Sequence, residues 1–352
     1  GMATARLFDE LDPLEKIKDA KFAEQGVVTG MQQMKAFRAL TPPALEFVEL
    51  AAKPEAERDA ARFEALKADP LVQYLVLDAQ ANVLCPATKL WNTGHGATMM
   101  REAVALMGGY GITEDCPGFL GHKWMDAQLE ATYEGPEAVQ RRQISVTMAN
   151  EVFLACYRNW IKELRAIADT HPDTGACVLA SAMELWLWTL EHLQTAKDAT
   201  GAKLFSGNRH GVVFPLCDAL CWLLASRQQI LDILELEAKG PQSATVAEGL
   251  AGYVNFFSDL AATQAASAAG QASRICAELV YGFTSPCCGG HDEGACCCGG
   301  KQDGTGKLAG TVEAFAKLRT QVDACLAGTR LAKDRAADAL AQVMIPEALD
   351  YP

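Results

Sequence analysis

The stretch that decides the fold is Met99 to Arg142, which reads MMREAVALMGGYGITEDCPGFLGHKWMDAQLEATYEGPEAVQRR. It contains a short apolar helix that ends in Gly108-Gly109-Tyr110-Gly111, and then a loop punctuated by Pro and Gly. Glycines adopt positive φ at little steric cost and bring bare backbone close to a neighbour. The stretch closes on Tyr133-Glu134-Gly135, directly before a helix that Pro136 is suited to open. The sequence therefore predicts two sharp turns, each at a helix end.

One carboxylate, that of Glu134, is placed by the second turn between an aromatic ring and a glycine. A carboxylate beside Tyr133 at a helix entrance can be partly desolvated, which general-base chemistry requires. Glu130 and Glu137 lie about one turn to either side, where their neighbours indicate solvated positions. Glu134 is therefore the candidate catalytic base. The plain alternative is that GGYG is a helix C-cap and YEGP an ordinary helix start.

The ordered set of turns resembles the C-terminal half of the acyl-CoA dehydrogenase family. That family carries a GGxGY-type turn, a DA-containing segment and a YEGT-type turn, which correspond here to 108–112, Asp126-Ala127 and 133–136. The likeness extends over roughly 69 to 150. The chain departs from the family pattern at Ala105, Met125 and Pro136, where the family usually has Gln, Arg and Thr.

The resemblance implies α,β-dehydrogenation of an acyl-CoA thioester in fatty acid metabolism. Glu134 would remove the α-proton, FAD would accept the β-hydride, and an electron-transfer flavoprotein would take the electrons. The FAD-binding candidates that the resemblance implies are Gly108, Gly109, Tyr110, Gly111, Tyr133 and Gly135. A homo-oligomer is the assembly that it implies.

A strand-rich stretch that could form the family's flavin-holding β-domain is missing from this sequence, as is the RxxFG-type turn that reaches the flavin pyrophosphate. We therefore expect the chain to be a fragment, or a subunit whose flavin half is a separate polypeptide. Alone it should be inactive and should not retain FAD. The alternative is a non-catalytic helical interaction or assembly module derived from the same fold.

Charge and composition narrow the class of protein further. The chain has 352 residues and a net charge of −13 without a basic run, which argues against nucleic acid and anionic membranes as partners. We find no secretory signal and no apolar run of about 18 residues. The 13 cysteines then indicate reduced thiols, and we expect a cytoplasmic protein.

Helix formers dominate the sequence, and β-branched alternation is nearly absent, which predicts an all-α protein. We expect an up-and-down bundle of acyl-CoA dehydrogenase C-terminal type at 1–150 and a second helical bundle at 151–352. The longest helices expected are 3–40, ended by Thr41-Pro42-Pro43, then 136–167 and 243–282. Residues 91–96 are expected to form a loop. An Ala/Ser-rich face at 261–269 is suited to close helix packing.

The second bundle contains a Cys/Gly-rich loop at 285–306. Thiolates and imidazoles are ligands for zinc and iron–sulfur clusters. The spacing of the residues lacks the CxxC arms of a tetrahedral site, so we predict no metal and interpret the segment as an oxidation-prone loop. A metal site remains the alternative, with six candidate ligands: Cys287, Cys288, His291, Cys296, Cys297 and Cys298.

Overall fold

The computed structural model describes residues 1–198, 200–283 and 305–343, and the chain divides into two compact units, Gly1–Trp160 and Ile161–Pro352. Within those described residues the regular elements are helices, and an isolated bridge between Lys197 and Lys203 is the only β pairing. The predicted all-α class is thus confirmed. No helix of the described part is both long and apolar enough to cross a membrane.

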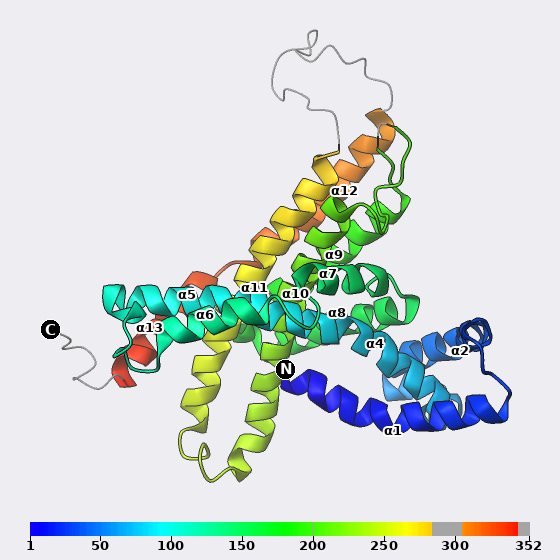
Figure 1. The fold of residues 1–352 in the computed structure, drawn as a ribbon, viewed down its shortest axis with the longest axis horizontal. Helices are drawn as coiled ribbons and strands as arrows, with labels where there is room; N and C mark the ends of the chain where they lie inside the picture. The colour runs from blue at the N-terminus through cyan, green and yellow to red at the C-terminus, as the bar shows by residue number, and fades with distance from the viewer. Residues whose placement is uncertain (199, 284–304, 344–352) are drawn as a thin grey trace, which may run out of the picture. The chain divides into compact units, whose positions relative to one another are not determined.

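Unit 1 contains most of the shorter helices (Figure 1). Its elements are α1 (Met2–Glu24), α2 (Gly30–Ala51), η1 (Glu55–Glu57), α3 (Ala60–Ala68), α4 (Pro70–Leu90), η2 (Trp91–His95), α5 (Gly96–Leu106), η3 (Gly108–Ile112), α6 (Leu120–Glu130), α7 (Glu137–Thr147) and the first half of α8 (Glu151–Thr170). Helix α4 packs against α1, α2, α3 and α7 and is the centre of this unit.

The expected helix over 3–40 is wrong in two respects. A turn at 25–29 divides it into α1 and α2, because Gly26 takes a φ of 68° and Thr29 forms a capping box with Gln32. Helix α2 then continues through Pro42 and Pro43, where the prediction had a helix end. Each proline removes a backbone hydrogen bond, but the helix beyond them buries Val48, and α2 packs against α4. Tertiary packing therefore overrides the local signal.

Two further boundaries differ from the prediction. The expected loop at 91–96 is a π-helical turn, η2, so α4 passes into α5 without leaving helical geometry. The expected helix over 136–167 is divided into α7 and α8. The break occurs because the Asn150 side chain accepts hydrogen bonds from the backbone N–H groups of Val152 and Phe153, at 2.9 and 3.1 Å. This is an N-cap, which starts a new helix.

Unit 2 contains the remainder of α8 and the longest helices. Its other elements are η4 (Pro172–Thr174), α9 (Ala176–Thr195), α10 (His210–Lys239), η5 (Gly240–Gln242), α11 (Leu250–Tyr281), α12 (Thr305–Cys325) and α13 (Thr329–Val343). Helices α10 and α11 lie side by side and are joined at 240–249, so α11 starts later than the expected 243 (Figure 1). Helix α9 packs against α10, α11 and α12.

Most of the alanine-rich face of α11 is buried, as its composition suggested: Ala261, Ala262, Ala265, Ala268 and Ala269, together with Ala272. Ala266 is only half-buried, and Ser267 is exposed. Gly175, between η4 and α9, has a φ of 79°, and a Cβ there would lie 2.7 Å from Cα of Ala262 and 2.9 Å from Cβ of Ala265. Both the backbone conformation and the close approach to α11 therefore require glycine.

Replacing Gly175 by Ala should destabilise unit 2. The left-handed backbone costs about 1–2 kcal/mol for an L-residue, and overpacking against α11 adds about 1–3 kcal/mol. Gly201 is a matched control, because its φ is 83° and a Cβ there would meet no atom within 4 Å. Urea unfolding should show a clearly larger loss of stability for Gly175→Ala than for Gly201→Ala. Equal losses would mean that the contact with α11 is not tight.

Candidate functional site

The GGYG turn forms the 3₁₀ segment η3 directly after α5. Gly108 has a φ of 60°, and a Cβ on Gly108 or Gly109 would meet nothing within 4 Å, so bare backbone is open at both positions. Gly111 differs, because its Cβ would lie 2.4 Å from the carbonyl oxygen of Val104. The Tyr110 hydroxyl donates a hydrogen bond to the Asp115 carbonyl at 2.9 Å. Gly111 thus closes the turn against α5, while Gly108 and Gly109 present their backbone outward.

The YEG turn has two consecutive residues in the left-handed region, Glu134 with a φ of 51° and Gly135 with a φ of 88°. Positive φ is uncommon for a residue with a Cβ and often marks a functional position. The Gln140 side chain, from the first turn of α7, holds the turn by donating to the Gly135 carbonyl at 2.9 Å. Pro136 is the N-cap of α7, and Glu137 is its first residue. The expected position at a helix entrance is therefore present.

Lys89, from the last turn of α4, supports the same turn from another direction. Its ammonium group lies 4.7 Å from the centre of the Tyr133 ring and donates to the Glu130 carbonyl at 3.0 Å. The Glu134 side chain is exposed, so the described residues of this chain do not supply the partial desolvation that its sequence neighbours suggested. The backbone of the turn is thus held in place, whereas the Glu134 side chain is open to solvent.

The two turns lie at the ends of a pair of exposed helices, α5 and α6, which pack on one another. Neither helix, both described in full, has a buried side chain. Large apolar side chains are exposed on the helices and next to them: Met99, Leu106, Met107, Ile112, Phe119, Met125, Leu129 and Tyr133. Apolar side chains that gather in one exposed patch are typical of an interaction site.

A cavity of about 390 Å³ lies between α1, α4 and α7 in the same unit. Its walls include the apolar residues Phe8, Leu11 and Ala81, and its polar groups include Asp78 and Gln140. Because Gln140 both lines this cavity and holds the Gly135 carbonyl, one side chain connects the cavity to the YEG turn.

Asp78 is the carboxylate of this cavity with the most perturbed surroundings. Burial raises the pKa of Asp78, and the side chains of Asn82, Tyr74 and Lys18 only partly offset the effect. Burial also raises the pKa of the Tyr74 phenol, and the nearby charge of Asp78 is a second, smaller cause of the same shift. The Tyr74 hydroxyl donates to the Asp78 carboxylate at 3.4 Å. Asp78 and Tyr74 are therefore the two cavity groups whose pKa values burial raises.

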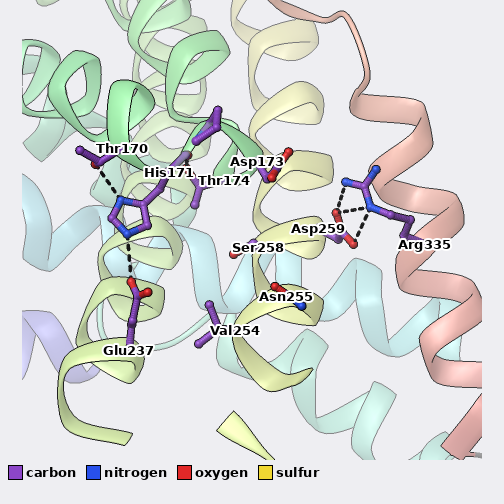
Figure 2. Close-up of a pocket in the computed structure, with 11 residues that line it drawn as sticks. Thr170, His171, Asp173, Thr174, Glu237, Val254, Asn255, Ser258, Asp259 and Arg335 are labelled. Atoms are coloured by element: carbon purple, nitrogen blue, oxygen red, sulfur yellow. Dashed lines mark hydrogen bonds and ion pairs between the residues drawn. The ribbon is translucent and has the colours of Figure 1, made fainter. Parts of the chain in front are cut away.

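Unit 2 has a more polar cavity of about 500 Å³ (Figure 2). His171 forms hydrogen bonds to the Thr170 hydroxyl at 2.8 Å and to the Glu237 carboxylate at 2.9 Å. The Thr170 hydroxyl also lies 3.3 Å from the carbonyl of Ile167 on its own helix, to which it donates a hydrogen bond. On the other side of the cavity, Nε of Arg335 lies 3.1 Å from the buried carboxylate of Asp259 and ties α13 to α11. The Arg335–Asp259 ion pair thus has a structural role.

The metal-ligand prediction falls on residues that are not described. Of the expected loop at 285–306, only Thr305 and Gly306 are described, and they begin α12. Cys287, Cys288, His291, Cys296, Cys297 and Cys298 all lie outside the described residues. In the part of the chain that is described, no group of three or more His, Cys, Asp or Glu residues could hold a metal ion.

Sequence reasoning missed three residues of this region, Asp78, Lys89 and Gln140. A signal for Asp78 was present, because it is the only acid in the apolar helix α4. Lys89 and Gln140 carried no such signal in the sequence. Each supports the YEG region only through contacts that form on folding: Lys89 with the Glu130 carbonyl and the Tyr133 ring, and Gln140 with the Gly135 carbonyl.

Replacing Asp78 by Asn should stabilise the protein at neutral pH. A carboxyl with a folded pKa above its unfolded value stabilises most below the unfolded value of about 4, and this contribution is lost as pH rises through the folded pKa. Asn keeps the shape without the buried charge. Urea unfolding at about pH 7 should therefore give a higher midpoint for Asp78→Asn than for wild type, whereas at about pH 3.5 the gain should vanish.

Asp12→Asn, at an exposed position of α1, is the control and should shift neither midpoint. A less stable Asp78→Asn protein at neutral pH would show that Lys18 and Tyr74 favour the ionised carboxylate.

The segment that contains both turns is similar to known proteins. Residues 49–149 match the family model described as acyl-CoA dehydrogenase, C-terminal domain. Comparison with curated proteins gave no match. A crystal structure of an acyl-CoA dehydrogenase from Bacillus anthracis, complexed with FAD, is similar at 13% identity and a TM-score of 0.45, covering 95% of this chain and 54% of that one. The chain thus spans about half the length of that protein. Residues 49–149, which include both turns, are therefore similar to the C-terminal domain of acyl-CoA dehydrogenases, in agreement with the resemblance found in the sequence.

Proposed function

We propose that this chain is the C-terminal part of an acyl-CoA dehydrogenase-like flavoenzyme that acts on an acyl-CoA thioester. The observation that carries the proposal is the pair of turns, GGYG and YEG, at the ends of an exposed helix pair inside the segment that matches the family model. FAD, held largely by a half that this chain lacks, would accept a hydride when bound. Electrons would then leave to an electron-transfer flavoprotein.

Glu134 is the base in this proposal. The α-proton of a thioester is a very weak acid, so the base must act where water is excluded and where the thioester carbonyl accepts hydrogen bonds. The left-handed backbone of Glu134, held by Gln140, supports a role that is more than structural. Because its carboxylate is exposed in this chain, the flavin half and the substrate would have to supply the desolvation.

The open backbone of Gly108 and Gly109 suits close contact with a flat cofactor, and Tyr133 offers an exposed ring. In the proposal these residues, with Tyr110 and Gly135, contribute the chain's share of the FAD site. Gly111 shapes the turn by packing on the Val104 carbonyl. No basic side chain among these six residues could neutralise a pyrophosphate, which supports the view that this group is held elsewhere.

The exposed apolar surface of α5 and α6 supports the proposal that another protein surface covers it. We propose that the covering surface belongs to the flavin-holding half. In this proposal 1–150 form the dehydrogenase-like domain, and 151–352 are an additional helical domain that packs against a partner subunit in a homo-oligomer.

The same exposed surface favours a second candidate function, a non-catalytic assembly module of this fold. Two measurements distinguish the flavoenzyme from the module: flavin binding by the assembled protein, and the loss of turnover on replacing Glu134. A non-catalytic module would show neither.

The isolated chain should purify without colour. Its share of the FAD site is a few backbone groups and one ring, while a pocket that retains a cofactor buries most of the ligand surface. Absorbance of the pure protein should therefore lack the flavin band at ~450 nm. A stoichiometric band would contradict the view that the flavin half is separate.

Glu134→Gln should abolish most turnover in the complex that contains the flavin half. Gln keeps the size of the side chain but cannot take the α-proton, so turnover should fall by about 10²–10⁴-fold. Binding of acyl-CoA and the melting temperature should change little. Glu130→Gln, four residues earlier at the end of α6, is the matched control and should be mild. Normal exchange of the substrate α-proton in Glu134→Gln would place the base elsewhere.

A further inference from the structure

Two cysteines of unit 2 are brought together by folding although they are 148 residues apart. Cys177 lies in the first turn of α9, and Cys325 is the last residue of α12. Their sulfur atoms are 3.1 Å apart, and both thiols are free and partly exposed. A disulfide bond is about 2.0 Å long, so a movement of about 1 Å at one helix end would allow the bond to form.

The groups around the pair place and polarise the two sulfurs. The Arg165 guanidinium lies 3.7 Å from the Cys177 sulfur and also donates to Ser181 and Glu184, each at 2.9 Å, which fixes its position. The Ser181 hydroxyl lies 3.5 Å from the Cys325 sulfur. A positive charge next to a sulfur stabilises it as a thiolate or as a leaving group.

The other described cysteines lack this combination of access and partner. Five of them are buried: Cys116, Cys156, Cys217, Cys221 and Cys276. Burial raises the pKa of Cys276 to about 12, which keeps it an inert thiol. Cys85 is exposed, but no sulfur contact to it parallels the contact between Cys177 and Cys325.

We propose that Cys177 and Cys325 form a reversible dithiol–disulfide site that reacts with small disulfides and links α9 to α12. In the first step the thiolate of one cysteine attacks a sulfur of oxidised glutathione, forming a mixed disulfide and releasing one glutathione thiolate. In the second step the other cysteine, having lost its proton to solvent, attacks the protein-bound sulfur and releases the second glutathione. One disulfide is made in the protein, and one is reduced to two thiols.

The electrostatics set the pH at which this exchange occurs. Burial raises the pKa of the Cys177 thiol, as does the neighbouring Cys325 sulfur, and Arg165 opposes both. The folded protein therefore keeps Cys177 as a thiol at neutral pH, and exchange through its thiolate becomes faster as pH rises. Because Cys177 is a thiol at neutral pH, we expect its exchange with disulfides to be slow there, unlike that of a catalytic cysteine.

The bond would constrain unit 2. It would join the start of α9 to the end of α12, two helices that already pack together. A cross-link that closes a long loop removes conformational freedom from the unfolded chain. The oxidised protein should therefore be more stable than the reduced one.

The test uses the full chain, treated with oxidised glutathione at about pH 8, alkylated, and digested for mass spectrometry. We expect a linked pair of peptides that contain Cys177 and Cys325, and loss of this link after dithiothreitol. The melting temperature should rise by several degrees on oxidation. The rise should be absent in Cys325→Ser and in Cys177→Ser, and should persist in the control Cys85→Ser.

Two results would overturn the proposal. One is recovery of Cys177 and Cys325 as alkylated thiols or stable glutathione adducts while the cysteines at 287–298 are linked to each other. The other is an oxidation-dependent rise in melting temperature that survives Cys325→Ser. The melting temperature of each oxidised variant is compared with that of the same variant in its reduced form. A loss of stability caused by the serine substitution itself therefore cancels.

Discussion

Each unit depends on one helix that is buried on most of its surface. In unit 1 this helix is α4, which is surrounded by α1, α2, α3 and α7. In unit 2 it is α9, which is surrounded by α10, α11 and α12. Burial of apolar area is the main favourable term in folding, so these two helices determine which neighbours can pack and where polar groups become isolated.

Polar groups on the central helices therefore acquire unusual properties. Asp78 on α4 is held in an apolar wall, where burial raises its pKa. On α9 the Trp186 indole is fully buried and donates to the Leu216 carbonyl at 3.0 Å, so its polar atom is satisfied. Cys177 lies at the edge of the same helix, where burial is incomplete and a second thiol reaches it. The degree of burial thus affects both the pKa of a polar group and its access to a partner.

The helix pair α5 and α6 is not organised around a buried helix, because neither of the two has a buried side chain. The two turns at its ends lie in the segment that matches the family model, and several of its large apolar side chains are exposed. Its stability as a pair comes from mutual packing, from the Lys89 contacts to Glu130 and Tyr133, and from the Gln140 hydrogen bond at the YEG turn. The part of the chain with the clearest motif is thus the part with the least core.

The sequence by itself determined the all-α class, the alanine face of α11 and the resemblance of 69–150, because helix periodicity, residue size and turn motifs are local properties. It also contained the Asn150 cap, a signal that a longer periodic pattern concealed. Only the tertiary structure decided that α2 passes through two prolines, that Asp78 lies in a cavity, and that Cys177 meets Cys325. These outcomes depend on contacts between segments far apart in the chain, whose packing energy outweighs the local preferences that a sequence pattern records.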